Sequence, residues 1–229
     1  MVRSNRSIAG QALKLLIFDL DGTLIDSRVD LVNSVNALLR HLHRPELPAP
    51  VIASYVGDGA PTLIRRALGD PKDDGYVQEA LEYFLSYYRA HKLDHTHVYP
   101  GVAEALTRLR GGQNGNRRHL AVLSNKPVNP SRQIVEALGL RAFFDQVYGG
   151  NSFATKKPDP EGARKLMEEA GAAPEETVII GDSSVDVLTG QNAGAWTCGV
   201  TYGFAPQTLQ TVPPDLLVDS PQELAEALR

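Results

Sequence analysis

The order of apolar and polar residues along the chain changes once, near residue 98. Before that point, a short apolar run at 13–18 predicts one buried strand that stops at an acidic turn. The residues that follow repeat apolar positions with helical spacing, and no strand-like alternation interrupts them. We therefore expect an all-helical block at 28–98. The helices predicted within it span 28–43, 50–55, 61–68 and 74–91.

Two of the predicted helices begin at residues that favour a helix start. Ser27 and Asp30 have the spacing of a capping box, in which two side chains satisfy free backbone N–H groups at the first turn. Asn129 with Pro130 predicts another start, because asparagine caps helices well and proline fits the first helical position. Both helices carry apolar residues on one face, so we expect each to pack on a core.

Beyond residue 98, predicted strands and helices alternate. Such alternation indicates right-handed crossovers and a parallel sheet that helices cover on both faces. The predicted fold class is α/β, a Rossmann-like doubly wound parallel sheet with the all-helical block inserted after its first strand. In this scheme 13–27 and 99–229 form the sheet domain, and 1–12 is a flexible tail. The strands predicted in the second part span 119–123, 146–148, 177–180, 195–200 and 216–218.

Composition and charge limit the expected partners and location. Hydrophobic residues make up 42% and charged residues 22% of the chain, which is ordinary for a globular protein. The net charge of −4 gives no reason to expect nucleic acid. No apolar run reaches the roughly 18 residues of a membrane span, and the one cysteine, Cys198, fits a reducing compartment. We expect a cytoplasmic monomer or homodimer without nucleic-acid or membrane partners.

Polar residues follow several of the predicted strands at the point where each strand ends. Since parallel strands end at one edge of the sheet, these side chains are expected to meet there. Clustered carboxylates resist ionising together unless a cation offsets them, and oxygen ligands favour Mg²⁺. Because Mg²⁺ commonly binds substrate phosphate as well, the set fits a small phosphorylated metabolite. The residues are Asp19, Asp21, Ser124, Lys157, Asp182 and Asp186.

The same segments resemble, in order and in composition, the four motifs of the haloacid dehalogenase (HAD) superfamily. They read DLDGTL at 19–24, SNK at 124–126, KP at 157–158 and GDSSVD at 181–186. The helical block resembles the C1-type cap of that superfamily, and VYPGV at 98–102 resembles the hinge that returns to the sheet domain. Within the superfamily, the chain is most similar to the phosphoglycolate phosphatases.

The resemblance implies a phosphatase in which four residues carry out the chemistry. Asp19 would be the nucleophile that forms an aspartyl phosphate. Asp21 would protonate the leaving alkoxide and then deprotonate the attacking water. Ser124 and Lys157 would hold the phosphoryl oxygens as charge moves through the transition state. The carboxylate at Asp21 favours phosphate esters over halides, because a halide leaving group needs no proton.

The resemblance also implies a Mg²⁺ site at the same edge of the sheet. Asp182 would bind the ion directly, together with the Asp19 carboxylate and the Asp21 backbone carbonyl. Asp186 lies one helical turn after Asp182, on the same face of the predicted helix. It would act from behind the metal ligands and orient Lys157.

A loop of the helical block is the predicted determinant of substrate choice. Gly57, Asp58 and Gly59 resemble the specificity loop of C1 caps, and glycine allows backbone to approach a ligand closely. An acid at position 58 would repel a substrate carboxylate unless it is paired. One of the two arginines that follow, taken to be Arg65, is predicted to bind such a carboxylate. The resemblance adds two further substrate-binding residues, Thr23 and Asn125.

Several alternatives stay open at this point. A pyrophosphatase or a nucleotide phosphatase would use the same residues, and the resemblance alone favours 2-phosphoglycolate. A HAD-fold binding protein without activity should lack one of the charged motif residues, and a signalling receiver should lack the helical block. The aromatic residues of the last predicted cap helix are expected in the cap core, and Lys126 receives no role. Those aromatic residues are Tyr83, Phe84, Tyr87 and Tyr88.

Overall fold

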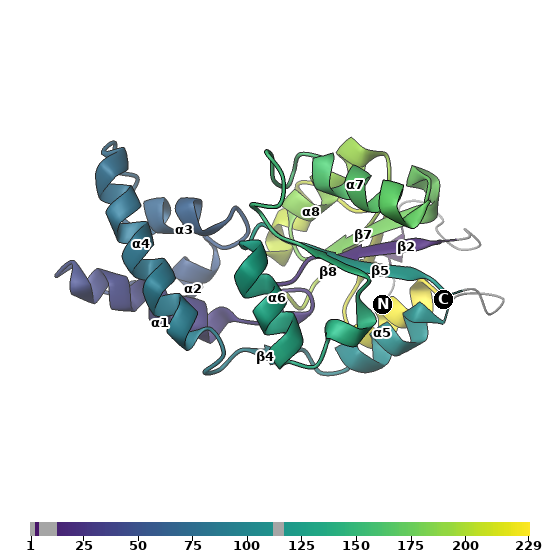
Figure 1. The fold of residues 1–229 in the computed structure, drawn as a ribbon, viewed down its shortest axis with the longest axis horizontal. Coiled ribbons are helices and arrows are strands. Elements are labelled where there is room, and N and C mark those ends of the chain that lie inside the picture. The colour runs from purple at the N-terminus through teal and green to yellow at the C-terminus, as the bar shows by residue number, and fades with distance from the viewer. Residues whose placement is uncertain (1–2, 5–12, 112–116) are drawn as a thin grey trace.

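The computed structural model describes residues 3–4, 13–111 and 117–229, which form a sheet domain and a group of helices beside it (Figure 1). The seven-stranded sheet has the order β1-β9-β8-β7-β2-β5-β6. Neighbouring strands are parallel, except that β1 runs antiparallel to β9. This is the doubly wound sheet that the alternating pattern predicts. The strands are β1 (Arg3–Ser4), β2 (Leu15–Phe18), β5 (His119–Leu123), β6 (Gln146–Tyr148), β7 (Thr177–Gly181), β8 (Trp196–Val200) and β9 (Leu216–Val218).

The interior strand β2 shows why the sheet lies between two layers of helices. Leu16 and Phe18 are buried against α5, α6 and α9, whereas Leu15 and Ile17 pack on the other face with α7 and α8. A strand that is apolar on both faces must be covered on both. The helices are α5 (Val102–Arg110), α6 (Val128–Ala137), α7 (Glu161–Ala170), α8 (Ser184–Ala193) and α9 (Pro221–Ala227), with short 3₁₀ turns η2 (Arg141–Phe143), η3 (Pro174–Glu176) and η4 (Pro206–Gln210).

Four helices form a second body, the helical unit, which comprises residues 28–91. It has a core of its own, to which α1, α3 and α4 contribute fully buried side chains such as Val35, Ile64 and Phe84. The helical unit lies beyond the edge of the sheet at which β2 ends (Figure 1). Its helices are α1 (Arg28–His41), α2 (Ala49–Ala53), α3 (Ala60–Ala67) and α4 (Asp74–His91).

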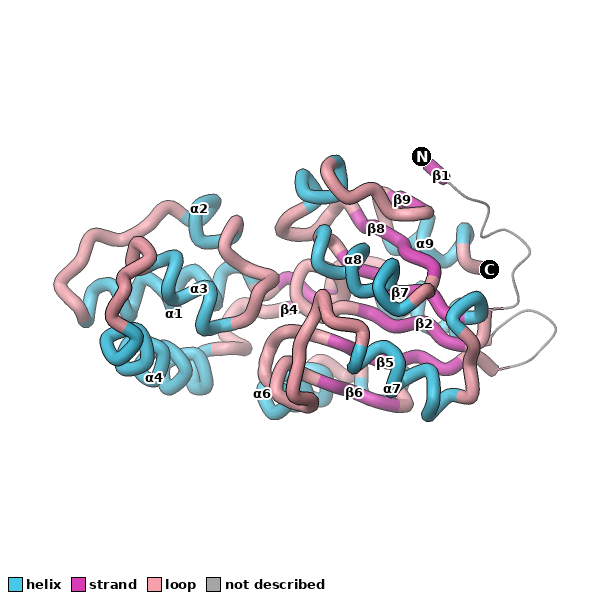
Figure 2. Tube along the Cα trace, turned by 90° about the horizontal axis from the view of Figure 1, so that it is seen from above, coloured by secondary structure: helices cyan, strands magenta, loops and turns pink. Residues whose placement is uncertain are grey.

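Two short strands join the helical unit to the sheet domain (Figure 2). β3 (Ile25–Asp26) and β4 (His97–Val98) pair antiparallel, so the outgoing and returning chain lie side by side. Asp30, near the start of α1, is 1% exposed. It accepts hydrogen bonds from the N–H groups of His95 at 3.0 Å and Thr96 at 2.8 Å, and from the Thr96 hydroxyl at 2.7 Å. Asp30 therefore clamps α1 to the returning chain.

Both capping predictions are wrong. The Ser27 hydroxyl donates to Asp21 instead of capping α1, and Asp30 is engaged at the hinge. Helix α6 starts before Asn129, and the N–H of its first residue donates to Asn151 Oδ1 at 2.8 Å. At the start of α1, the N–H of Arg28 donates instead to Asp26 Oδ1 at 3.0 Å, whereas the acceptor at the start of α6 comes from a residue distant in sequence.

The prediction that 1–12 form a flexible tail differs from the structure at Arg3–Ser4. These two residues pair with β9, because the edge of a sheet offers unpaired backbone groups. The rest of that prediction lies outside the described residues.

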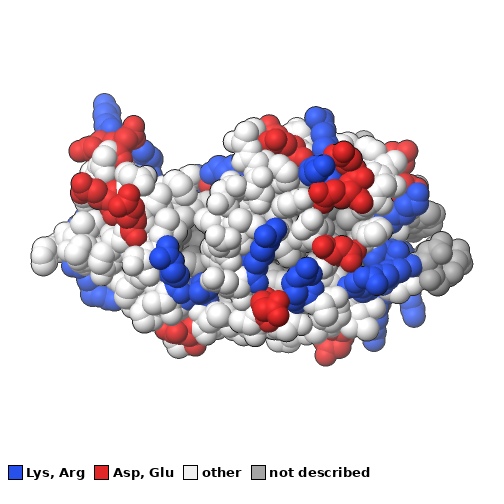
Figure 3. Space-filling view, in the orientation of Figure 1, with Lys and Arg blue, Asp and Glu red and all other residues white. Residues whose placement is uncertain are grey.

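Among the helices that the structure describes, none is both long and apolar enough to cross a membrane. Acidic and basic side chains are interspersed over the face drawn in Figure 3.

Candidate active site

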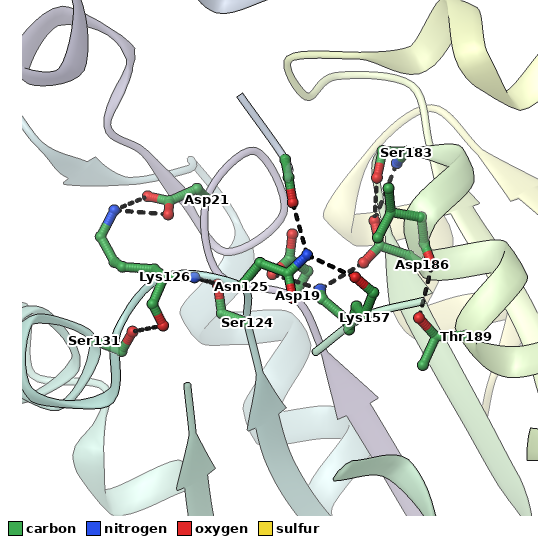
Figure 4. Close-up of polar contacts among 12 residues, drawn as sticks. Asp19, Asp21, Ser124, Asn125, Lys126, Ser131, Lys157, Ser183, Asp186 and Thr189 are labelled. Carbon is green, nitrogen blue, oxygen red and sulfur yellow. Dashed lines mark hydrogen bonds and ion pairs between the residues drawn. The ribbon is translucent and has the colours of Figure 1, made fainter. Parts of the chain in front are cut away.

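Reactive side chains meet at the carboxyl ends of three neighbouring strands (Figure 4). Asp19 follows β2, Ser124 follows β5 and Asp182 follows β7. They line a cavity of about 70 Å³, several times the roughly 10–15 Å³ that one water molecule needs. The helical unit lines the same cavity with apolar side chains, among them Leu63 and Phe84. The cavity therefore has a polar wall from the sheet and an apolar wall from the helices.

Lys157 is the cation beside the Asp19 carboxylate. Its Nζ lies 2.9 Å from Asp19 Oδ1 and 2.7 Å from Asp186 Oδ1. Burial alone would lower the pKa of Lys157, but the charges of Asp186 and Asp19 raise it overall, so the amine stays protonated. Asp186 is held in turn by the backbone N–H and the hydroxyl of Ser183. The lysine is thus fixed between two carboxylates, one after β2 and one on α8.

Three carboxylates lie close enough to share a cation. Ligand oxygens of Asp19, Asp182 and Asp186 all lie within 4.8 Å of one another. Burial raises the pKa of Asp19 to about 6, although the positive charge of Lys157 lowers it in part. Burial also raises the pKa of Asp182 to about 8. Neighbouring carboxylates add to both increases. Buried negative charge in excess favours a bound cation, and oxygen donors fit Mg²⁺. Since both Asp186 oxygens already accept hydrogen bonds, Asp19 and Asp182 are left to face an ion.

A second ion pair lies on the other side of Asp19 and involves Lys126 (Figure 4). Lys126 Nζ donates to both carboxylate oxygens of Asp21, at 2.9 and 2.7 Å. It also lies 4.9 Å from the ring centroid of Tyr88 on α4, a cation–π contact between the two bodies. Lys126 received no predicted role because the proline after it indicated a loop. Its position two residues after Ser124 was the signal that could have found it.

Asn125 ties the helical unit to the edge of the sheet. Its Nδ2 donates to the carbonyls of Gly57 at 2.9 Å and Lys157 at 3.0 Å. Its Oδ1 is buried and has no hydrogen-bond partner among the described residues. Of the predicted substrate-binding residues, Asn125, Gly57 and Gly59 line the cavity. Gly59 has a φ of 87°, which glycine adopts without strain.

Asp58 and the arginines of α3 lie outside the cavity lining. Asp58 pairs with Arg66 at 2.7 Å, so its charge is offset within the helical unit. Arg65 donates to the carbonyl of Pro71 and to the carboxylate of Asp74. The structure does not bring Arg65 to the cavity, because Pro71 before α4 and Asp74 at its start accept hydrogen bonds from its guanidinium.

Thr23 is not brought to the cavity either. It is 1% exposed and lines a separate, smaller cavity together with Val102 and Leu106 of α5. The turn after β2 thus directs this side chain into the core of the sheet domain, away from Asp19 and Asp21. The geometry therefore gives no support to Thr23 as a substrate-binding residue.

A segment after β8 holds Asp182, and no prediction included it. The N–H groups of Phe204 and Ala205 donate to Asp182 Oδ2, the latter at 3.1 Å. Two glycines leave room for the carboxylate, since a Cβ on Gly22 or Gly203 would lie 2.4 or 2.2 Å from Asp182 atoms. Backbone groups make these contacts, so the side chains of the segment gave no signal.

The parallel sheet, its acidic edge and the inserted helices define a class of hydrolase, and comparison with known proteins agrees. Residues 16–200 match the model of the family described as haloacid dehalogenase-like hydrolase. A match over this much of the chain shows the family. The chain belongs to the haloacid dehalogenase-like hydrolases.

More particular names come from individual relatives. A phosphoglycolate phosphatase of Chromobacterium violaceum is 38% identical over 221 residues, which cover 95% of this chain and 97% of the relative. One of Vibrio vulnificus is 36% identical with the same coverage. The crystal structure of a predicted phosphoglycolate phosphatase from Haemophilus somnus 129PT is similar with a TM-score of 0.87 and 28% identity, covering 96% of this chain and 100% of that one.

Proposed function

We propose that the chain is a phosphatase that hydrolyses 2-phosphoglycolate, a small phosphate monoester, with Mg²⁺ as cofactor. The observation that carries the proposal is that Asp19, Asp21 and Ser124 line one cavity beside an acidic cluster, with Lys157 paired to Asp19 at 2.9 Å. Relatives at 36% and 38% identity over nearly the whole chain are named phosphoglycolate phosphatases. This similarity favours that ester over pyrophosphate and nucleotides.

The reaction begins with Asp19 as the nucleophile. One carboxylate oxygen attacks phosphorus, the bond from phosphorus to the ester oxygen breaks, and an aspartyl phosphate forms. The Lys157 ammonium and the Ser124 hydroxyl hold the phosphoryl oxygens while negative charge is redistributed. Asp186 is a positioning residue, because it acts through the Lys157 ammonium at 2.7 Å.

Asp21 handles the protons of both steps. As an acid, Asp21 gives a proton to the ester oxygen. Glycolate therefore leaves with a neutral hydroxyl group instead of an alkoxide. As a base it then takes a proton from the water that attacks the aspartyl phosphate, which releases inorganic phosphate and restores Asp19. Hydrogen bonds from Lys126 and from the Ser27 hydroxyl fix the direction of its carboxylate.

Asp19 and Asp182 are the side chains that would hold the Mg²⁺ ion. When bound, the ion supplies positive charge that offsets the repulsion between a carboxylate nucleophile and a phosphoryl group. The protein prepares Asp182 for this role with the N–H groups of Phe204 and Ala205, which fix one of its two oxygens and leave the other open.

The helical unit serves as a cap, and with its returning chain it corresponds to residues 28–98. It has its own hydrophobic core and is joined to the sheet domain through the β3–β4 pair. Its apolar side chains form one wall of the cavity. A cap of this kind excludes bulk water from the aspartyl phosphate until the leaving group has departed.

Phosphate release from a panel of esters tests the proposal. The panel holds 2-phosphoglycolate, pyrophosphate, a nucleoside monophosphate and p-nitrophenyl phosphate, each with Mg²⁺. We expect the enzyme to prefer 2-phosphoglycolate to each of the others by about tenfold or more in kcat/KM. A higher value for pyrophosphate or the nucleotide would replace the substrate and keep the chemistry. Absence of phosphate release from the whole panel would overturn the phosphatase itself.

The cytoplasmic location and the monomeric or homodimeric state stay predictions. Cys198 is free and buried in the sheet core, which suits a reducing compartment. The absence of nucleic-acid partners, which is expected from the net charge, also stays a prediction.

A further inference from the structure

Lys126 offers a hydrogen-bond donor that the reaction described above does not use. Among the described residues that line the cavity, it is the one with a positive charge. Its Nζ has three N–H donors, and Asp21 accepts through two oxygens. With the side chain 7% exposed, water has little access to the donor that remains. A buried ammonium with a spare donor is well suited to bind an anionic group of a ligand.

The backbone around Lys126 fixes the position of this ammonium. Its N–H donates to Ser124 Oγ at 3.3 Å, and its carbonyl accepts from the N–H of Gly150 at 2.9 Å. Gly149 allows the chains to approach closely, since a Cβ there would lie 2.5 Å from the Lys126 carbonyl oxygen. The same turn therefore positions both Lys126 and the phosphoryl-binding Ser124.

Tyr88 supplies a second unused donor from the opposite wall of the cavity. Its side chain is 5% exposed and lines the cavity beside Lys126, and no group among the described residues accepts a hydrogen bond from its hydroxyl. Burial raises the pKa of Tyr88 to about 12, so the hydroxyl stays protonated at neutral pH. A buried hydroxyl without a partner costs free energy that a ligand oxygen would recover.

The position of Asp21 determines where the leaving group lies relative to Lys126. Asp21 must reach the ester oxygen to protonate it, and Lys126 Nζ lies 2.7 Å from Asp21 Oδ2. In 2-phosphoglycolate, the carboxylate carbon is two covalent bonds from that ester oxygen. We propose that Lys126 and Tyr88 together bind the carboxylate of the leaving group and so select phosphate esters of short 2-hydroxy acids.

This selection rests on the proposed hydrolysis of phosphate esters, and it gives each anionic end of the substrate its own cation. Lys157 faces the phosphoryl group, and Lys126 faces the carboxylate. Arg66 of the helical unit is already paired with Asp58 outside the cavity lining. Because Lys126 belongs to the sheet domain and Tyr88 to the helical unit, a bound carboxylate also links the two bodies.

Two variants and a pair of substrates test the carboxylate site. The substrates are 2-phosphoglycolate and 2-hydroxyethyl phosphate, which has the same length but no carboxylate. Lys126→Met should lower the ratio of kcat/KM values between the two esters by about 10- to 100-fold, and Tyr88→Phe by about 2- to 10-fold, as expected for a charged and a neutral hydrogen bond. In Tyr88→Phe, most of the loss should come from weaker binding of the carboxylate ester, seen as a higher KM.

Matched controls separate this effect from a general loss of lysine or tyrosine. Lys165 pairs with Glu168 on the outer side of α7. Tyr87, which precedes Tyr88 in the chain, stacks on His91. Lys165→Met and Tyr87→Phe should leave the ratio between the two esters at the wild-type value.

Non-reacting inhibitors measure the same site without the chemistry. 3-Phosphonopropionate has the length and charges of 2-phosphoglycolate, whereas n-propylphosphonate lacks the carboxylate. In competition with p-nitrophenyl phosphate, the wild-type protein should bind the first about 10- to 100-fold more tightly, and Lys126→Met should remove most of this preference. The wild-type comparison tests the site even where the lysine variant fails to fold.

Two results would overturn the site. One is equal inhibition of the wild-type protein by both phosphonates. The other is a Lys126→Met protein in which kcat falls equally for both esters and their ratio is unchanged, because Lys126 would then serve Asp21 alone. Failure of the proposed function is a different result, since the wild-type protein would then release phosphate from none of the esters.

Discussion

At the scale of single residues, the site depends on pairing buried charges across different strand ends. Asp19 pairs with Lys157, and Asp21 pairs with Lys126. Removing one member of a buried pair leaves an uncompensated charge, which costs about 3–5 kcal/mol. Asp182 pairs with no lysine among the described residues and receives backbone N–H groups instead. Lys157 and Lys126 therefore offset the negative charges of Asp19 and Asp21, whereas the charge of Asp182 is left for a cation to offset.

The substitution Asp19→Asn separates chemistry from stability. The amide is nearly the same shape but is a poor nucleophile, so kcat should fall about 1,000-fold or more. Burial raises the pKa of Asp19 to about 6, which means that its charge is costly in the folded state. Lys157 keeps Asp186 as a partner at 2.7 Å in this variant, so no uncompensated charge remains. Thermal unfolding of the metal-free variant should therefore occur at or above the wild-type temperature. Turnover above about a tenth of wild type would contradict the covalent route through Asp19.

The substitution Gly203→Ala tests the support of Asp182. Its Cβ would lie 2.2 Å from Asp182 Cβ and 2.4 Å from the Gly22 carbonyl oxygen, so the carboxylate must shift. Overpacking of this kind costs about 1–3 kcal/mol of stability, and the Mg²⁺ concentration for half-maximal activity should rise about tenfold. Gly111→Ala is the control, because its nearest neighbour would be 3.5 Å away. An unchanged Mg²⁺ requirement in Gly203→Ala would remove the role given to this segment.

At the scale of elements, periodicity predicts long helices and buried strands better than it predicts their ends. The 18-residue helix α4 lies at its predicted position because its apolar spacing repeats over several turns, and the five-residue strand β5 because it is a continuous apolar run. Strands β3 and β4 have two residues each, which is too short for any period. The roles of Ser27 and Asp30 were predicted wrongly, since Ser27 donates to the turn after β2 and the partners of Asp30 come from a distant part of the chain.

The hinge can be tested through Asp30→Asn. The amide has nearly the same shape, but its NH₂ replaces an oxygen that accepts from His95 and Thr96, so buried donors lose their partner. Hydrogen bonds to a charged group contribute about 1.5–3 kcal/mol, and we expect the free energy of unfolding in urea to fall by that amount. Glu82→Gln, on the exposed side of α4, is the matched control. A loss below about 0.5 kcal/mol would show that the clamp contributes little.

At the scale of the whole molecule, the cavity lies between two bodies with separate cores. The fold class and the motif residues could be predicted, because strand alternation and strand ends are local features of the chain. The contact between Lys126 and Tyr88 could not, since it depends on how the helical unit packs against the sheet. That Arg65 lies outside the cavity lining could not be predicted for a related reason, because the direction of a side chain on a short helix depends on its neighbours in space.

The three carboxylates of the acidic cluster, with one lysine beside them, predict that a divalent cation stabilises the entire fold. A ligand that binds the folded state alone contributes about 2.7 kcal/mol at 100 times its Kd. For a chain of this length, that corresponds to a rise of about 5–10 °C in Tm. We therefore expect chelation by EDTA to abolish phosphate release, Mg²⁺ to restore it, and Mg²⁺ to raise the Tm of the wild-type protein by this amount.

The variant Asp182→Asn identifies where that cation binds. Since Asp182 is one of the two carboxylates left to face an ion, its amide should reduce the Mg²⁺-dependent rise in Tm to less than about a third of the wild-type rise. Asp74→Asn, at the exposed start of α4, should keep the full rise. Equal rises in Asp182→Asn and wild type would mean that the ion binds elsewhere on the protein. Full activity in excess chelator would mean that hydrolysis proceeds without the ion, and Lys157 alone would then have to offset the phosphoryl charge beside Asp19.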